Sequence, residues 1–314
     1  MRTQLSRSIT LLSIAAMLAS CSAPPALDGC LPEQGATGTF VSGSGNDASG
    51  TGTLAAPFRS LTQALEVAPL GTTIHVLCGT FSDATGETFP LDVSGLAIQG
   101  LGADKTSLAY EGSGTNVTAL VVLNGSASVK ALEVVGFTGN TIELRGGTTT
   151  IEDVVAVGGG GGSMLAAIGA AVAELLRVDL SNGGDEGILV RDTASISVVD
   201  SEIRANESDG IDAEGAANVF VRGTRITGND SSGVETDSSG TIDLGTADDP
   251  GGNTILGNAE WQIQDRRAAF AGTTIMAVGN DFGTPVSGVK TGPDSQALVW
   301  EIWNSGNEID FGGP

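Results

Sequence analysis

Apolar residues in the middle of the chain recur every 23 positions. Three columns in phase can be followed over three successive repeats: Leu180, Ile203 and Ile226, then Ile188, Ile211 and Val234, then Ile196, Val219 and Ile242. A repeat of this length holds three short strands and three turns, which cannot bury a core alone, so neighbouring repeats must stack and share one. The spacing therefore predicts a β-solenoid, an all-β fold.

A second pattern places Asn three residues after an apolar position. It occurs at Phe137 and Asn140, Ile203 and Asn206, Ile226 and Asn229, and Ile255 and Asn258. Asn tolerates left-handed backbone at a turn, and stacked amides can hydrogen-bond from coil to coil along the axis. We therefore interpret these asparagines as structural.

The repeat is interrupted once and ends before the C-terminus. Between Ile226 and Ile255 the interval grows to 29, so six residues are inserted, within 245–253, and a loop should project from one turn. The phase fades beyond Phe282. Residues 294–303, with their apolar positions and tryptophans, are expected to form a terminal helix that covers the last coil.

The N-terminal end of the repeat carries a helix signal. Ser60-Leu61-Thr62-Gln63 is a capping-box pattern. Because an uncovered terminal coil would expose its core and strand edges, we expect this helix to cap it. We therefore expect one β-helix domain over 38–314, made of the N-terminal cap and first coils (38–100), further coils (101–285) and a C-terminal cap (286–314).

The start of the chain has the features of an export signal. Two arginines, Arg2 and Arg7, precede an apolar run that is too short for a transmembrane helix. Leu-Ala-Ser-Cys, ending at Cys21, resembles a bacterial lipobox. The resemblance implies removal of residues 1–20, several acyl chains on Cys21 as a durable membrane anchor and, with Ser22 next, sorting to the outer membrane of the cell envelope. Residues 21–37 would be a tether.

The net charge limits the classes of partner that the protein can bind, and the cysteines predict a disulfide. The chain has 14 basic and 37 acidic residues and a net charge of −23, so we expect neither nucleic acid nor an anionic surface as a partner. Apart from Cys21, the cysteines are Cys30 and Cys78. In an oxidising compartment a disulfide between them is expected, and it would staple the tether to the first coil, whereas the alternative is two free thiols.

The N-terminal part of the domain resembles a known module. The segments that carry the resemblance are Val41-Ser-Gly-Ser-Gly-Asn-Asp47, Pro57-Phe-Arg-Ser-Leu61, Gly71-Thr-Thr-Ile-His-Val76, Gly79-Thr-Phe81 and Gly86-Glu-Thr-Phe-Pro90. They resemble the opening of right-handed parallel β-helix proteins of the pectate-lyase superfamily, specifically a bacterial exported group catalogued as a domain of unknown function. The resemblance covers residues 40 to about 100 and implies a three-sheet solenoid. It also supports the disulfide, because Cys78 stands where such modules commonly have Pro.

The resemblance leaves the activity open, since related openings occur in polysaccharide lyases, in glycoside hydrolases and in proteins with no known activity. A uronan lyase needs cations for the substrate carboxylate and a base for its α-proton. This chain has lysines only at 105, 130 and 290 and is strongly acidic. A lyase is therefore disfavoured.

Four acids should share the outer face of two adjacent coils: Asp212, Glu214, Glu235 and Asp237. Adjacent coils lie ~4.8 Å apart, and a pair of acids at roughly 5 Å is what a retaining glycosidase uses. Asp212 and Glu235 are also candidates for binding Ca²⁺. The third interpretation is an ordinary solvated face, because Arg191 lies one coil before Glu214 and Arg266 one coil after Asp237.

Two outward aromatic residues, Phe220 and Trp261, are candidates for stacking on a sugar, with Arg266 as a polar contact. We hypothesise a non-enzymatic cell-envelope lipoprotein whose long face supports binding or adhesion, with a glycan as the favoured ligand. The alternative is a polysaccharide hydrolase that uses the four acids. No cofactor is expected apart from a possible Ca²⁺.

Overall fold

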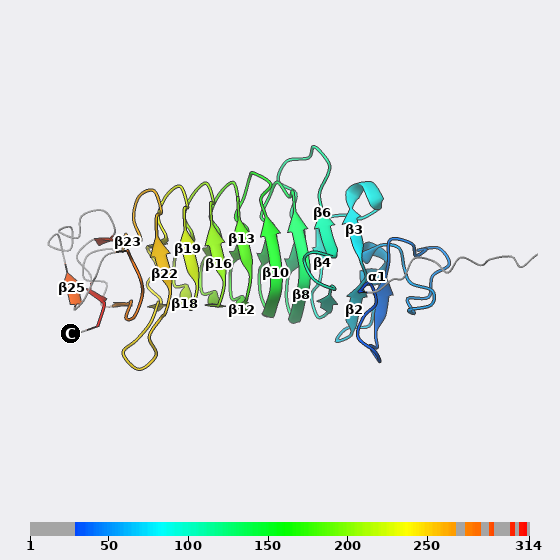
Figure 1. The fold of residues 1–314 in the computed structure, drawn as a ribbon, viewed down its shortest axis with the longest axis horizontal. Coiled ribbons are helices and arrows are strands. Elements are labelled where there is room, and N and C mark those ends of the chain that lie inside the picture. Colours follow the sequence, from blue (N-terminus) through cyan, green and yellow to red (C-terminus); the bar gives the residue numbers. More distant parts are fainter. Residues whose placement is uncertain (1–28, 268–273, 284–288, 292–301, 305–307, 313–314) are drawn as a thin grey trace, which may run out of the picture.

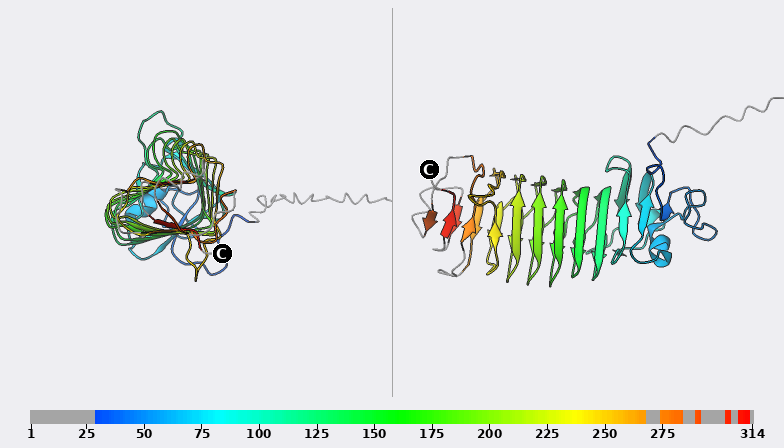
Figure 2. Two further views of the ribbon diagram at one scale, coloured as in Figure 1. Left: turned by 90° about the vertical axis from the view of Figure 1, so that its left-hand side faces the viewer. Right: turned by 90° about the horizontal axis from the view of Figure 1, so that it is seen from below.

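The chain winds into a rod of stacked coils, with helix α1 near one end and the C-terminus at the other (Figure 1). The computed structural model describes residues 29–267, 274–283, 289–291, 302–304 and 308–312. Viewed along the axis, successive coils superpose (Figure 2). The fold is the expected right-handed parallel β-helix.

Within the described residues, one face of the rod is a parallel sheet with nine strands. Each coil contributes one short strand, and neighbouring strands are a coil apart in sequence. Along the axis they are β4 (Leu91–Asp92), β7 (Leu120–Val122), β9 (Ile142–Leu144), β11 (Leu165–Ala167), β14 (Ile188–Val190), β17 (Ile211–Ala213), β20 (Val234–Thr236), β23 (Ile263–Asp265) and β26 (Ile302–Asn304).

The other two faces form one bent sheet with 18 strands. The bend is visible at β10, which pairs along its first half with β12 and along its second half with β13. The N-terminal strands are β1 (Thr39–Val41), β2 (Thr73–Val76), β3 (Gly79–Ser82), β5 (Ala97–Gln99), β6 (Thr106–Ala109), β8 (Ser126–Val135) and β10 (Thr148–Val157). The remaining strands are β12 (Val172–Leu176), β13 (Asp179–Ser181), β15 (Ser195–Val199), β16 (Glu202–Arg204), β18 (Asn218–Arg222), β19 (Arg225–Thr227), β21 (Ile242–Asp243), β22 (Thr254–Leu256), β24 (Ile275–Met276), β25 (Val289–Thr291) and β27 (Glu308–Asp310).

The apolar columns lie in register and form the core. Ile188 pairs with Ile211, which pairs with Val234, and all three side chains are completely buried. The columns that start at Ile196 and Leu180 continue from coil to coil in the same way. This register confirms the prediction from the 23-residue spacing. Burying each such side chain stabilises the fold by roughly 1.5–3 kcal/mol.

Three of the four asparagines form the predicted ladder, whereas Asn140 donates to the Glu143 carboxylate and accepts the backbone N–H of Ser163. The side-chain Nδ2 of Asn206 donates to Oδ1 of Asn229, and Nδ2 of Asn229 donates to Oδ1 of Asn258, both at 2.9 Å. Each Oδ1 also accepts a backbone N–H from the preceding coil. The ladder therefore satisfies buried backbone and side-chain groups together.

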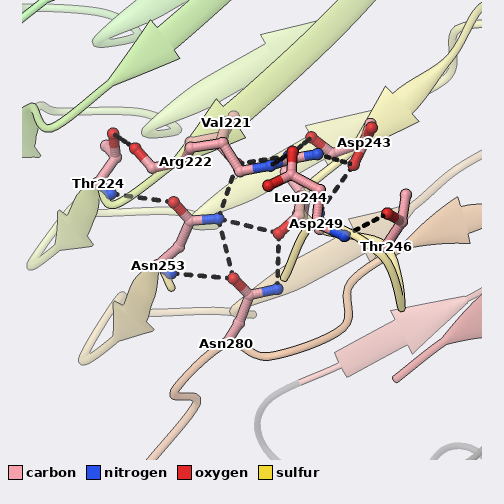
Figure 3. A network of polar contacts seen from close by, with 10 residues as sticks. Val221, Arg222, Thr224, Asp243, Leu244, Thr246, Asp249, Asn253 and Asn280 are labelled. Carbon is pink, nitrogen blue, oxygen red and sulfur yellow. Dashed lines mark hydrogen bonds and ion pairs between the residues drawn. The ribbon is translucent and has the colours of Figure 1, made fainter. Parts of the chain in front are cut away.

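A second ladder, which the spacing did not reveal, lies beside the inserted loop (Figure 3). Nδ2 of Asn253 donates to Oδ1 of Asn280 at 2.9 Å and to the carbonyl oxygens of Val221 and Leu244. The insertion itself projects between β21 and β22, as expected. Arg222 fastens it through ion pairs with the carboxylates of Asp243 (3.0 Å) and Asp249 (2.8 Å).

The N-terminal end is closed by helix α1 (Leu61–Val67), as predicted. A short 3-10 helix, η1 (Asp83–Thr85), comes later, after strand β3. The Ser60 side chain caps α1 by accepting the N–H of Gln63. The free N–H groups of Leu61 and Thr62 donate to the carboxylate of Glu87, at 2.8 and 2.9 Å. The Glu87 carboxylate therefore caps the N-terminus of α1, where the backbone N–H groups have no acceptor within the helix.

The disulfide between Cys30 and Cys78 is present, with the Cα atoms 5.2 Å apart. Residues 1–28, which include the expected export signal and the expected lipidation site Cys21, lie outside the described residues. So does most of the expected helix at 294–303, but Ile302 and Trp303 belong to strand β26, which pairs with β23, so a helix there is wrong for these two. Among the described residues, the structure contains no helix with the length and hydrophobicity to cross a membrane.

Candidate functional site

Three columns of side chains run across the outer face of β14, β17, β20 and β23. The central column holds the outward residue of each strand, the second lies in the turn before each strand, and the third directly follows it. We call these twelve residues the acidic strip: Leu189, Asp212, Glu235 and Gln264 in the centre, then Glu186, Asp209, Ser232 and Trp261, then Arg191, Glu214, Asp237 and Arg266.

Asp212 occupies the middle of the strip and is the residue with the most unusual environment. Its side chain points away from the core, yet only 8% of the residue is exposed. Its carboxyl group forms no hydrogen bond or ion pair with any residue that the structure describes. Burial, reinforced by the negative charges of Glu214, Glu235, Glu186 and Asp209, raises its pKa to about 8. The carboxyl group is therefore protonated at neutral pH.

Glu235 lies next to Asp212 in the following coil and is 9% exposed. It forms an ion pair with the guanidinium group of Arg266. Burial and the charge of Asp209 raise the pKa of Glu235, and they outweigh the opposing effect of Arg266. The two adjacent carboxyl groups therefore differ in kind, because Glu235 has a counter-charge and Asp212 has none among the described residues.

Two further carboxyl groups face the same region. Burial is the main cause of a raised pKa at both Glu186 and Asp209. Glu186 accepts the hydroxyl of Ser163 at 2.8 Å, and Asp209 accepts the backbone N–H of Ser232 at 2.6 Å. These bonds stabilise the charged forms but do not cancel the effect of burial.

The ion pairs predicted from the register are confirmed at one position and wrong at another. Arg191 pairs with Glu214 at 2.6 Å, as its place one coil earlier indicates. Arg266 pairs with Glu235 and not with Asp237, which is exposed. The reason is electrostatic, since a guanidinium gains more from a carboxylate that is withdrawn from water than from one that is solvated.

The structure brings Trp261 and Arg266 to the strip but not Phe220. Trp261 is half-buried in the turn before β23, and its carbonyl accepts the N–H of Gly233. Phe220 is on β18, in the 18-stranded sheet, where its neighbours in register are Ser197 and Asp243. Because the turn after β17 redirects the chain onto another face, these two aromatic residues cannot form one sugar platform.

A family model described as "Protein of unknown function (DUF1565)" matches residues 43–287, which contain the whole strip. The chain belongs to this family. No curated protein matches it.

Among solved structures, a rhamnogalacturonan lyase is similar at a TM-score of 0.44 and 11% identity, over 81% of this chain and 76% of that one. The catalytic domain of a GH87 alpha-1,3-glucanase in complex with nigerose gives 0.41 and 15%, over 87% and 58%. The A-module of the Azotobacter vinelandii mannuronan C-5 epimerase AlgE4 gives 0.37 and 14%, over 77% and 87%.

The candidate calcium site is not assembled. No group of three or more His, Cys, Asp or Glu side chains suited to a metal ion occurs within the described ranges. Asp212 and Glu235 therefore lack the further oxygen ligands from acidic side chains that a Ca²⁺ site of six to eight oxygens normally includes.

A cavity of about 710 Å³ lies elsewhere, between residues 29–37 and the coils beside them, and His75, Gln99 and Lys105 line it. Nε2 of His75 donates to the carbonyl of Thr37 at 3.1 Å, and the His75 ring stacks on Phe40. The contacts of His75 attach residues 29–37 to the coils, so we interpret the groups that line the cavity as structural. We therefore place the candidate site at the acidic strip.

Three residues in the second column of the strip escaped the sequence analysis: Glu186, Asp209 and Ser232. Their signal was present, because they are also 23 residues apart and each stands two positions before an inward apolar residue. A turn position gives no indication of which way its side chain points, so only the structure places them beside Asp212.

Proposed function

We propose that the protein is a lipid-anchored protein of the bacterial outer membrane whose β-helix binds a glycan on the acidic strip. The lipobox-like sequence at Cys21 supports the anchor, and the disulfide fits an exported protein. The observation that carries the binding proposal is the unpartnered and nearly buried Asp212. A ligand group that pairs with this carboxyl group would supply the hydrogen-bond partner that the described residues do not.

The chemistry of the strip suits a sugar polymer. A protonated carboxyl group both donates and accepts hydrogen bonds, as a sugar hydroxyl does. Ser232 in the next coil, and Gln264 and Arg266 in the coil after it, add hydroxyl, amide and guanidinium groups to the strip, and adjacent coils are ~4.8 Å apart. The half-buried indole of Trp261 lies at one end of the strip, where it can stack on a sugar ring.

Binding by the full chain, purified in detergent micelles, to a panel of neutral, acidic and amino polysaccharides tests this proposal. Asp212→Ala removes the central carboxyl group and should weaken the best ligand about tenfold or more. The matched control is Asp230→Asn, in the exposed turn next to Ser232, which should bind like the wild type. Unchanged binding by Asp212→Ala, or no binding to any glycan, would reject the strip as a glycan site.

The protonated state of Asp212 favours hydrolysis as a second candidate function. In a retaining glycosidase, one protonated carboxyl group gives its proton to the glycosidic oxygen while a second carboxylate attacks the sugar carbon, and water then releases the sugar. Asp212 and Glu235 stand in adjacent coils with these two characters. Release of reducing ends should then be lost in Asp212→Asn, although this variant still binds. If the wild type releases no reducing ends from any glycan that it binds, hydrolysis is excluded and the binding proposal stands.

A further inference from the structure

The acidic strip has more negative groups than partners for them. Six of its twelve residues are acidic and two are basic. The two basic residues, Arg191 and Arg266, form ion pairs with Glu214 and Glu235. The other four acids have no basic partner within the described part of the chain: Glu186, Asp209, Asp212 and Asp237. Glu186, Asp209 and Asp212 are each at least half-buried, so water stabilises their negative charges poorly.

We infer that the strip selects a cationic glycan, one with free amino groups on its hexosamine units, and that an ammonium group binds at Asp212. This inference rests on the proposed glycan-binding function and specifies its ligand. Asp212 is the second, independent observation beside the acidic cluster, because its side chain is nine-tenths buried, points into the strip and has no partner among the described residues. An ammonium group would supply the missing counter-charge.

The alternatives fit this surface less well. A divalent metal requires several oxygen atoms at about 2.3–2.6 Å from one point, and no group of three or more His, Cys, Asp or Glu side chains suited to a metal ion occurs in the described ranges. An ammonium group has three hydrogen-bond donors and needs only a few acceptors around it. A polyuronate would bring carboxylates onto a surface that already has an excess of them, and like charges in contact oppose binding.

Binding of an ammonium group has a consequence for protons. Asp212 holds its proton in the free protein because its neighbours are negative and it is withdrawn from water. A cation beside it favours the carboxylate, so the proton leaves to solvent when the ligand binds. At about pH 5 the amino groups of the ligand carry their protons and Asp212 still holds its own, so the released proton reports on the protein.

The test compares a glucosamine oligomer with its fully N-acetylated counterpart of the same length and with a galacturonate oligomer, on the full chain at about pH 5 by titration calorimetry. We expect the amino oligomer to bind about tenfold more tightly than the acetylated one. Repeating the titration in two buffers of different ionisation enthalpy should show net proton release. Asp212→Asn should abolish the release and most of the preference, whereas Asp230→Asn should keep both.

The outcomes separate this inference from the proposed function. Equal binding of the amino and acetylated oligomers, or a preference for galacturonate, overturns the inference while glycan binding stands. An equal loss of preference in Asp230→Asn and Asp212→Asn also overturns it, because the selectivity would then come from the net charge of the protein. If no oligomer binds, glycan binding itself fails.

Discussion

The state of Asp212 leads to a stability prediction that needs no ligand. The folded protein keeps the proton of Asp212 up to about pH 8, whereas the unfolded chain loses it near the ordinary value of 3.8. Between these values the folded state binds more protons than the unfolded state, so the free energy of unfolding falls as pH rises from about 4 to about 8. Replacing the carboxyl group by an amide of the same shape removes this dependence.

The magnitude follows from the pKa of Asp212. Each pH unit above the unfolded pKa costs about 1.36 kcal/mol until the folded group ionises. Asp212→Asn should therefore raise the free energy of unfolding by about 4 kcal/mol at pH 7 and by about 1.5 kcal/mol at pH 5. Urea denaturation of wild type and variant at the two pH values measures the difference.

Glu202→Gln on β16 is the control, because Glu202 forms exposed ion pairs with Arg204 and Arg225 and is not among the charges that raise the pKa of Asp212. It should give no gain, since loss of an exposed ion pair changes stability by only about 0–1 kcal/mol. The reasoning about Asp212 is refuted if Asp212→Asn gains the same amount at pH 5 and pH 7, or gains nothing at either.

Three further predictions concern the scaffold. Asn229→Ala breaks the ladder on both sides and leaves buried groups unpaired, so it should lower the free energy of unfolding by about 2–3 kcal/mol in urea denaturation. Arg222→Ala releases the inserted loop, and limited proteolysis should then cut within residues 244–253 faster than in the wild type. Replacing Cys30 and Cys78 by Ser opens a link across 48 residues and should cost about 2–4 kcal/mol, measured as a lower urea midpoint.

The fold was predictable because each coil repeats the previous one. In a solenoid, a residue contacts its equivalent one repeat away, so a sequence interval of 23 gives the three-dimensional neighbour directly. Ile188, Ile211 and Val234 stack for this reason, and so do Asn206 and Asn229. The prediction failed for the ladder beside the insertion, although Asn229 and Asn258 pair across the same insertion as expected.

Asn253 and Asn280 illustrate that failure. They are 27 residues apart and follow the insertion, so no repeat interval relates them, yet their side chains hydrogen-bond. An insertion changes the sequence distance between coils but not the spacing of the coils themselves, which the backbone hydrogen bonds set at ~4.8 Å. The ladder can therefore continue with new residues that the 23-residue pattern does not contain.

The candidate site was predictable as a set of positions but not as an electrostatic arrangement. Asp212 and Asp237 both read as outward acids in adjacent coils, yet the first is 8% exposed and the second is exposed. Asp212 lies within strand β17, whereas Asp237 follows strand β20. The strand pattern also leaves out Asp209 and Glu186 in the preceding turns, whose negative charges help to raise the pKa of Asp212.

This combination distinguishes Asp212 from the paired acids around it. A purely structural outer face gains most when every carboxylate has a counter-charge, as Glu214 and Glu235 have. Asp212 departs from that rule at a cost in stability that an amide in its place would remove. Departures that lower stability concentrate at functional sites. We therefore expect Asp212→Asn to be more stable than the wild type and to have lost the preference for the amino oligomer. Both results would then have the same cause, the unpartnered carboxyl group of Asp212.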